Sequence, residues 1–169
     1  MSSALLRNAL VLGLLSAIGP FAIDTYLPSF HEIASQLNAT AIEVQQTLSA
    51  YLLSFAAMTL WHGAISDRFG RRLALLAGNV MFAAASLLCA AAWDGPSLWL
   101  ARGLQGIASA FVITGSLALI AGAYPEPGPR ARAFGLAGIV SGIAMVVGPT
   151  LGGILAAWSG WRWIFLTNG

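Results

Sequence analysis

The chain has 169 residues, of which 58% are hydrophobic and only 8% are charged, and its mean hydropathy is +0.80. A soluble domain carries roughly 25% charged residues, so this composition excludes a soluble globular protein and indicates a membrane protein. The net charge of +2 is small and the basic residues are divided among separate loops, which excludes a nucleic-acid-binding surface. The single cysteine, Cys89, lies in an apolar run and provides neither a disulfide framework nor a cysteine metal site.

Five long apolar segments follow one another along the chain. Each is long enough to cross a hydrocarbon core of about 30 Å as a helix, and helices are expected because a spanning segment must satisfy its own backbone hydrogen bonds. The first run is longer than the core of a signal peptide, so it is predicted to be a membrane span. The predicted spans are residues 5–27, 44–65, 73–92, 98–121 and 134–158, and a sixth begins near residue 163.

The placement of the basic residues, all of them arginines, predicts the orientation of these spans. With the amino terminus in the cytoplasm, Arg162 is the one arginine in an outer segment, and Arg102 lies within the fourth span. Basic residues resist translocation, so this asymmetry predicts a cytoplasmic amino terminus. The cytoplasmic arginines are then Arg7, Arg68, Arg71, Arg72, Arg130 and Arg132.

The segment between the second and third spans carries the most specific motif. It reads Gly63-Ala64-Ile65-Ser66-Asp67-Arg68-Phe69-Gly70-Arg71-Arg72. Gly63 permits close approach of another helix, Gly70 permits a tight connection, and a helix amino terminus would stabilise the Asp67 carboxylate. Charge alone would also fit a positive-inside anchor. The ordered pattern closely resembles the loop signature of the major facilitator superfamily, and this resemblance implies a cytoplasmic latch formed by Gly63, Asp67, Arg68, Gly70, Arg71 and Arg72.

The fourth span contains an arginine at membrane depth. Arg102, Gln105 and Ser109 share one helical face. An intramembrane arginine costs about 2.5–3.5 kcal/mol on insertion scales, so Arg102 is expected to face a cavity or a partner. The alternative is an arginine whose head group reaches water at the outer interface. The run Leu98–Gly106 resembles the motif of proton-coupled members of the superfamily, which implies that Arg102 assists proton movement.

The fifth span is rich in glycine. Pro149 and Gly148 predict a kink, and glycines four residues apart let another helix approach closely, although ordinary helix packing would explain them too. The run Gly148-Pro149-Thr150-Leu151-Gly152-Gly153 resembles the antiporter motif of the superfamily. Ala144 departs from that pattern, because many antiporters have another glycine there. The resemblance implies that Gly148, Pro149, Gly152 and Gly153 pack the span tightly.

The first span supplies a candidate proton site. Asp24 shares a helical face with Ser16 and Pro20, and a carboxylate in a low-dielectric cavity can take up and release protons near neutral pH. The alternative is a solvated carboxylate at the interface. Residues 24–28 and 44–51 resemble drug/proton antiporters of the bicyclomycin-resistance type, which implies proton coupling by Asp24 and Arg102. The candidates for a substrate cavity are Tyr51, Ser54, Met58 and Gln105.

These resemblances imply an all-α membrane protein in which residues 1–169 form part of the amino-terminal six-helix bundle of a twelve-helix transporter. They imply proton-coupled efflux of drugs or small hydrophobic compounds by alternating access, across the cell inner membrane. The expected partners are the lipid bilayer, protons, a small-molecule substrate and a missing carboxy-terminal half, without which the chain is expected to be inactive. No enzyme activity, metal, cofactor or nucleic-acid partner is expected, because the sequence has no nucleophile–base pair, metal-ligand cluster or phosphate-binding glycine loop.

Two alternatives stay open at this point. The first is a proton-coupled symporter of a sugar or an organic acid. The second is a chain that does not transport, either as a truncated product or as a subunit that pairs with another chain.

Overall fold

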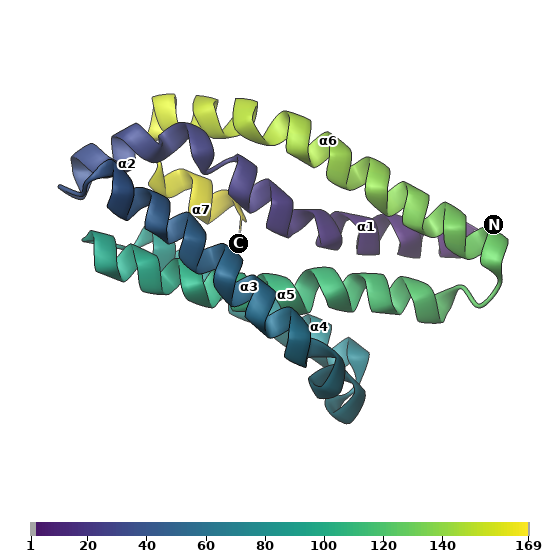
Figure 1. Cartoon of the computed structure of the whole chain (residues 1–169). Helices are drawn as coiled ribbons and strands as arrows, with labels where there is room; N and C mark the ends of the chain where they lie inside the picture. The colour runs from purple at the N-terminus through teal and green to yellow at the C-terminus, as the bar shows by residue number, and fades with distance from the viewer. Residues whose placement is uncertain (1–2, 169) are drawn as a thin grey trace.

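The computed structural model describes residues 3–168, which form helices packed side by side (Figure 1). Five stretches are long and apolar enough to cross a membrane, and the described residues contain no strand. The predicted all-helical membrane fold, with five spans and the start of a sixth, is therefore confirmed. The long helices are α1 (Ser3–Asp24), α3 (Ala41–Phe69), α4 (Arg71–Ala90), α5 (Gly95–Ala123) and α6 (Pro127–Ser159). The short elements are the 3-10 turn η1 (Leu27–Ser29), α2 (Phe30–Gln36) and α7 (Arg162–Asn168).

Helices α3 and α5 begin before the predicted apolar runs because polar residues cap them outside those runs. At the start of α3, the Glu43 backbone N–H donates to Thr40 Oγ1 (3.2 Å), and the Thr40 N–H donates to the Glu43 carboxylate (2.7 Å). At the start of α5, the Ser97 N–H donates to Asp94 Oδ1 (2.8 Å). Both are capping boxes, which satisfy backbone donors that have no partner within the helix. Hydropathy thus marks the apolar part of each of these helices, and the capping residues mark where the helix begins.

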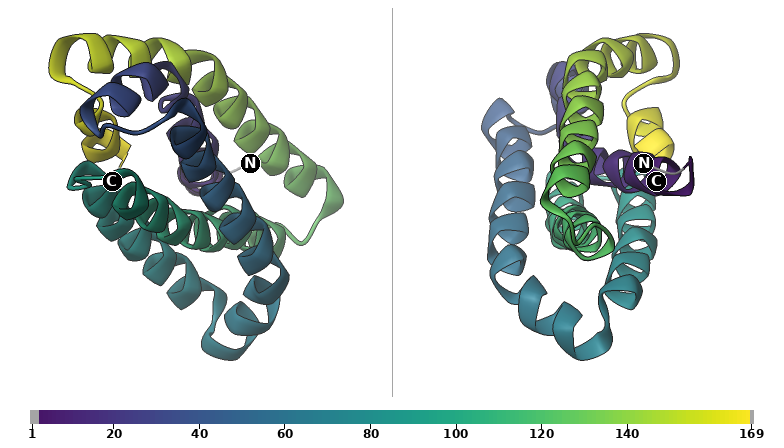
Figure 2. Two further views of the ribbon diagram at one scale, coloured as in Figure 1. Left: turned by 60° about the vertical axis from the view of Figure 1, so that its left-hand side comes forward. Right: turned by 90° about the vertical axis from the view of Figure 1, so that its right-hand side faces the viewer.

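Helix α5 occupies the centre of the bundle, where it packs against α1, α3, α4 and α6. Helices α1 and α6 lie side by side and run in the same direction (Figures 1 and 2). Helices α3 and α5 approach closely at Gly106 of α5, where a Cβ atom would overlap the Tyr51 carbonyl oxygen and Ser54 Oγ of α3. Only glycine permits this contact, so α3 and α5 are fixed against each other at that level.

The segment between α1 and α3, which joins the first two predicted spans, contains η1 and α2. Helix α2 is tied to the turn between α6 and α7. Trp161 Nε1 donates to Gln36 Oε1 (3.0 Å), and Arg162 donates to the same oxygen (3.1 Å) and to the Ala92 carbonyl oxygen (3.1 Å). We call Gln36, Trp161 and Arg162 the end clasp. Beneath it lies an apolar core that includes Tyr26, Ile33, Leu37, Val44, Cys89, Leu98, Trp161, Ile164 and Phe165.

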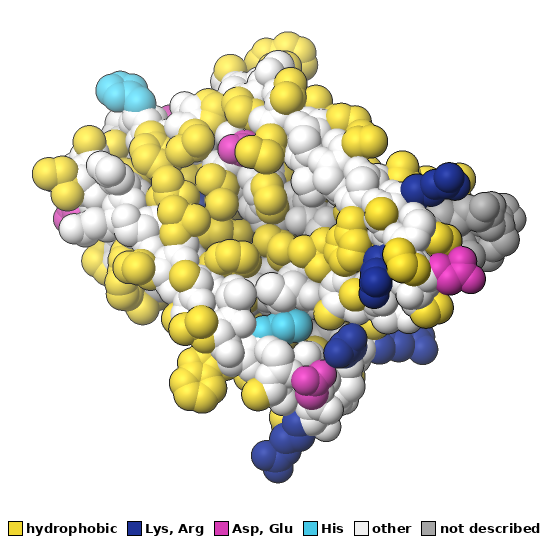
Figure 3. Space-filling view, turned by 45° about the vertical axis from the view of Figure 1, so that its right-hand side comes forward, with side chains coloured by type: hydrophobic (Ala, Val, Ile, Leu, Met, Phe, Trp, Pro, Cys, Tyr) yellow, Lys and Arg dark blue, Asp and Glu magenta, His cyan; other side chains and the backbone are white. Residues whose placement is uncertain are grey.

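The surface of the bundle suits lipid. Large apolar side chains on α3, α4 and α6 are exposed, among them Leu60, Val80 and Val146. Hydrophobic side chains cover much of the face in Figure 3, and the arginines in that view gather toward the end of the molecule where α1 begins. An apolar belt with charge gathered at one end is the arrangement that a bilayer requires of a spanning protein.

Candidate functional site

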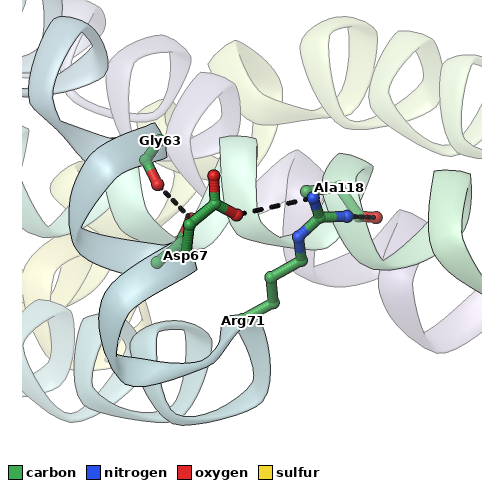
Figure 4. A network of polar contacts seen from close by, with 5 residues as sticks. Gly63, Asp67, Arg71 and Ala118 are labelled. Atoms are coloured by element: carbon green, nitrogen blue, oxygen red, sulfur yellow. Dashed lines mark hydrogen bonds and ion pairs between the residues drawn. The ribbon is translucent and has the colours of Figure 1, made fainter.

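The α3–α4 connection is held against α5 by one arginine. Arg71 Nη2 lies 3.5 Å from Asp67 Oδ1, and Arg71 Nη1 donates to the Ala118 carbonyl oxygen on α5 (3.4 Å), as Figure 4 shows. Gly70 joins the two helices with a φ of +94°, a backbone conformation that residues with a side chain rarely adopt. The motif therefore builds a sharp turn whose charged pair reaches a third helix.

One expectation about this turn is wrong. Asp67 lies in the last turn of α3 and not at a helix amino terminus, so Arg71 supplies its positive partner in place of the helix dipole. A Cβ built at Gly63 meets no described atom within 4 Å, so no helix of this chain approaches it closely. The remaining arginines of the motif point elsewhere: the Arg68 guanidinium lies 5.6 Å from the Phe69 ring centroid, and Arg72 lines an apolar groove between α1 and α4.

Arg102 of α5 is fully buried, so its head group does not reach water in this structure. Its Nη1 donates to Gln105 Oε1 (2.6 Å), and Gln105 donates in turn to Ser86 of α4 (2.8 Å). Its guanidinium carbon lies 4.4 Å from the Tyr26 ring centroid and 4.6 Å from that of Tyr51. Within the described residues no carboxylate pairs with it, and Nε and Nη2 have no hydrogen-bond partner. The Gln105 amide oxygen and the aromatic faces therefore supply the favourable contacts to this charge.

Asp24 lies at the end of α1, against the glycines of α6. A Cβ at Gly148 would come within 2.9 Å of the Asp24 Cβ, and one at Gly152 would overlap the Thr25 carbonyl oxygen. One carboxylate oxygen of Asp24 is buried without a hydrogen-bond partner in the described chain. Gly153 lies near Pro28, and Pro149 is exposed. The antiporter-like motif thus packs directly on the segment that carries Asp24.

The structure does not bring Asp24 and Arg102 into contact. Asp24 faces α6, whereas Arg102 faces the rings of Tyr26 and Tyr51. Tyr26, which was not among the predicted site residues, follows Asp24 by two residues, and its ring packs on the Arg102 guanidinium. No local pattern in the sequence signals this contact between distant residues.

The four residues predicted for a substrate cavity are mostly enclosed. Tyr51 and Gln105 are buried between helices, Ser54 donates to the Tyr51 carbonyl oxygen (3.0 Å), and Met58 is half-buried. None of them lines the apolar groove between α1 and α6, which has a volume of about 430 Å³. This groove was not predicted from the sequence, and it is lined by Leu14, Ala17, Ile18, Phe21, Val140, Ile143, Ala144 and Val147.

Comparisons with known proteins agree with this arrangement. The family described as "Major Facilitator Superfamily" matches residues 10–169. The chain is 38% identical to the puromycin resistance protein pur8 of Streptomyces alboniger over an alignment of 155 residues. This alignment covers 92% of this chain and 30% of that protein. The chain is 37% identical to the methylenomycin A resistance protein of Bacillus subtilis (81% of this chain, 29% of that protein). It is 38% identical to the multidrug resistance protein Stp of Mycobacterium tuberculosis (74% and 23%).

Proposed function

We infer the function from one premise: the chain belongs to the Major Facilitator Superfamily. We propose that the protein to which it contributes exports drugs or small hydrophobic compounds in exchange for protons, by alternating access. The names of the relatives, which are resistance proteins, support this substrate class. The chain spans about 30% of the length of the first two relatives, so this activity is proposed for a complete protein with both helical bundles.

The observation that carries the proposal is the presence of two ionisable side chains within one helical bundle. Arg102 is buried without a counter-ion, and Asp24 has a buried carboxylate oxygen without a partner in the described chain. Such groups are costly in a membrane and mark ion or proton pathways. Asp24 would carry the proton, and each proton that moves inward releases about 2.3 kcal/mol per 100 mV of membrane potential. Arg102 would bias the protonation of Asp24 as the protein changes state.

The turn between α3 and α4 would act as the cytoplasmic latch. Asp67 and Arg71 form an exposed pair, and the space beside Gly63 is open. A helix from the second bundle could therefore approach α3 at Gly63 and exchange contacts with this pair. The latch would favour one of the two access states.

Reconstitution of the complete protein in vesicles tests the proton role. Drug-driven proton release is measured for the parent protein, for Asp24→Asn and for the matched control Asp94→Asn, which changes an aspartate in a helix cap. We expect loss of coupling in Asp24→Asn and retention in Asp94→Asn. Unchanged coupling in Asp24→Asn would refute the role of Asp24, and substrate uptake driven by inward protons would favour the symporter.

The proposed location is the cell inner membrane, with a cytoplasmic amino terminus. Because Cys89 is the only cysteine, a Cys89→Ser background allows single reporters to be introduced. In intact spheroplasts a membrane-impermeant maleimide should label Asn38→Cys and should label Arg7→Cys only after permeabilisation. The reverse pattern would contradict the proposed orientation.

A further inference from the structure

The proposed function leaves a physical gap, because Arg102 is expected to influence Asp24 and yet does not touch it. The segment that connects them is Gly19–Tyr26, the last part of α1 and the residues just beyond it. Asp24 lies within this segment. Its two ends are held by different tyrosines, and both tyrosines contact Arg102.

Tyr51 of α3 holds the first end. Its hydroxyl donates to the Gly19 carbonyl oxygen (3.3 Å) and lies 2.6 Å from Ser109 Oγ on α5. Because the phenol has one proton and gives it to Gly19, Ser109 is the donor in the second bond. The next residue, Pro20, lacks a backbone N–H, so α1 is missing a helical hydrogen bond at this point. The bond from Tyr51 therefore acts on the weakest part of α1.

Tyr26 holds the second end. Its hydroxyl lies 2.6 Å from Thr47 Oγ1 on α3, and Thr47 itself donates to the Val44 carbonyl oxygen, so Tyr26 is the donor. Tyr26 is fully buried, and its ring also packs against Phe30 and Phe165. This end of the segment therefore has little freedom to move independently of α3.

The opposite side of the segment is equally confined. Gly148 and Gly152 of α6 contact Asp24 and Thr25 so closely that a Cβ would not fit, and Asn168 of α7 donates to Thr25 Oγ1 (3.2 Å). Of the side chains described in contact with the segment from α3, α5, α6 and α7, Arg102 alone is charged. A displacement of the Arg102 guanidinium would therefore change its contacts with both rings, which hold the two ends of the segment.

We propose that Tyr51 and Tyr26 are positioning residues through which Arg102 sets the place of Asp24, because they hold both ends of the α1 segment that carries it. The cation packs on the two rings, one hydroxyl bonds to the carbonyl oxygen beside Pro20, and the other bonds to α3. This inference rests on the proposed proton role of Asp24. It assigns to Tyr51 a mechanical role in place of contact with substrate.

The test follows the titration of Asp24 in the 169-residue chain itself, in lipid nanodiscs, by NMR of ¹³C-labelled aspartate carboxyl groups. The chain has three aspartates, so Asp67 and Asp94 serve as internal references. Tyr51→Phe retains a ring on Arg102 and removes both hydroxyl bonds. We expect it to change the titration midpoint of Asp24 by roughly 0.4–1 pH unit, the effect of one hydrogen bond, and to leave Asp67 and Asp94 unchanged.

Arg102→Gln and the double variant decide whether the tyrosine carries the influence of the arginine. If it does, Arg102→Gln changes the midpoint, and adding Tyr51→Phe changes it no further. A midpoint that Tyr51→Phe leaves unchanged, or effects of the two substitutions that simply add, would overturn the proposal. If Tyr51→Phe does not fold, Thr47→Val removes the partner of Tyr26 instead and is held to the same two criteria.

The inference and the proposed function can fail separately. A complete protein in which Asp24→Asn keeps full coupling rejects the proton role, whatever the midpoints are. Midpoints that are independent of Tyr51 and Tyr26 reject the positioning role, even in a protein that couples drug export to protons.

Discussion

Replacement of Gly152 by alanine is expected to separate α1 from α6. A methyl group at this position would overlap the Thr25 carbonyl oxygen and would lie 2.7 Å from both the Thr25 carbonyl carbon and its Cα atom. Carbon atoms normally pack about 3.5–4 Å apart, so one helix must move by roughly 1 Å. Because the obstructing atoms belong to backbone, no side-chain rotation relieves the overlap.

The size of the effect follows from two opposing contributions. Overpacking costs about 1–3 kcal/mol, and a backbone obstruction belongs at the upper end of that range. Alanine in place of glycine stabilises a helix by about 1 kcal/mol. Gly152→Ala is therefore expected to lower the free energy of unfolding by about 2 kcal/mol. Gly138 of the same helix has no described atom within 4 Å of a Cβ, so Gly138→Ala should raise the free energy of unfolding by about 1 kcal/mol. The free energies of unfolding of the two variants should therefore differ by about 3 kcal/mol.

Reversible unfolding of the chain in bicelles by SDS, followed by tryptophan fluorescence, provides the assay. Trp158 and Trp161 lie close to the α1–α6 crossing in sequence and report on it. Equal stability of Gly152→Ala and Gly138→Ala would refute the reasoning, since only Gly152 faces a neighbouring backbone.

Three further predictions use the same chain. Arg102→Met should change the free energy of unfolding by less than about 1 kcal/mol, because the contacts of a buried cation barely offset its desolvation; a loss above about 3 kcal/mol in SDS unfolding would contradict this. Asp67→Asn should cost less than about 1 kcal/mol, as expected for an exposed ion pair, and a loss above about 2 kcal/mol would argue against a pair that is only superficial. The side chain and backbone N–H of Ser97 hold the pKa of Asp94 below its ordinary value of 3.8. The cap's contribution to stability is therefore complete above that value and is lost as the pH falls through the lower folded pKa. The protection of the Ser97 amide from exchange, measured relative to its intrinsic exchange rate at each pH, should fall only there, and Asp94→Asn should abolish this loss of protection.

The spans could be predicted from the sequence because the bilayer imposes a length and a composition that can be read locally. Helix α2 could not, since it is short, polar on one side and stabilised by Trp161 and Arg162 much further along the chain. The position of Asp67 in the last turn of α3 was also missed, because the helix continues through the charged residues until Gly70 ends it.

The site could be predicted only in part, for a related reason. A glycine pattern indicates that a helix will approach, but it does not name the partner: Gly148 and Gly152 contact Asp24 and Thr25, whereas Gly138 faces open space. The burial of Arg102 among tyrosines likewise depends on the assembled bundle. The role proposed for Arg102 in proton coupling is still a prediction.

The end clasp has a consequence for the order in which such a chain enters a membrane. In the proposed orientation Arg162 is translocated, against the usual preference of basic residues. Its two described acceptors, Gln36 Oε1 and the Ala92 carbonyl oxygen, both precede it in the chain. During synthesis from the amino terminus, these acceptors reach the outer side first, so both are already present there when Arg162 is translocated.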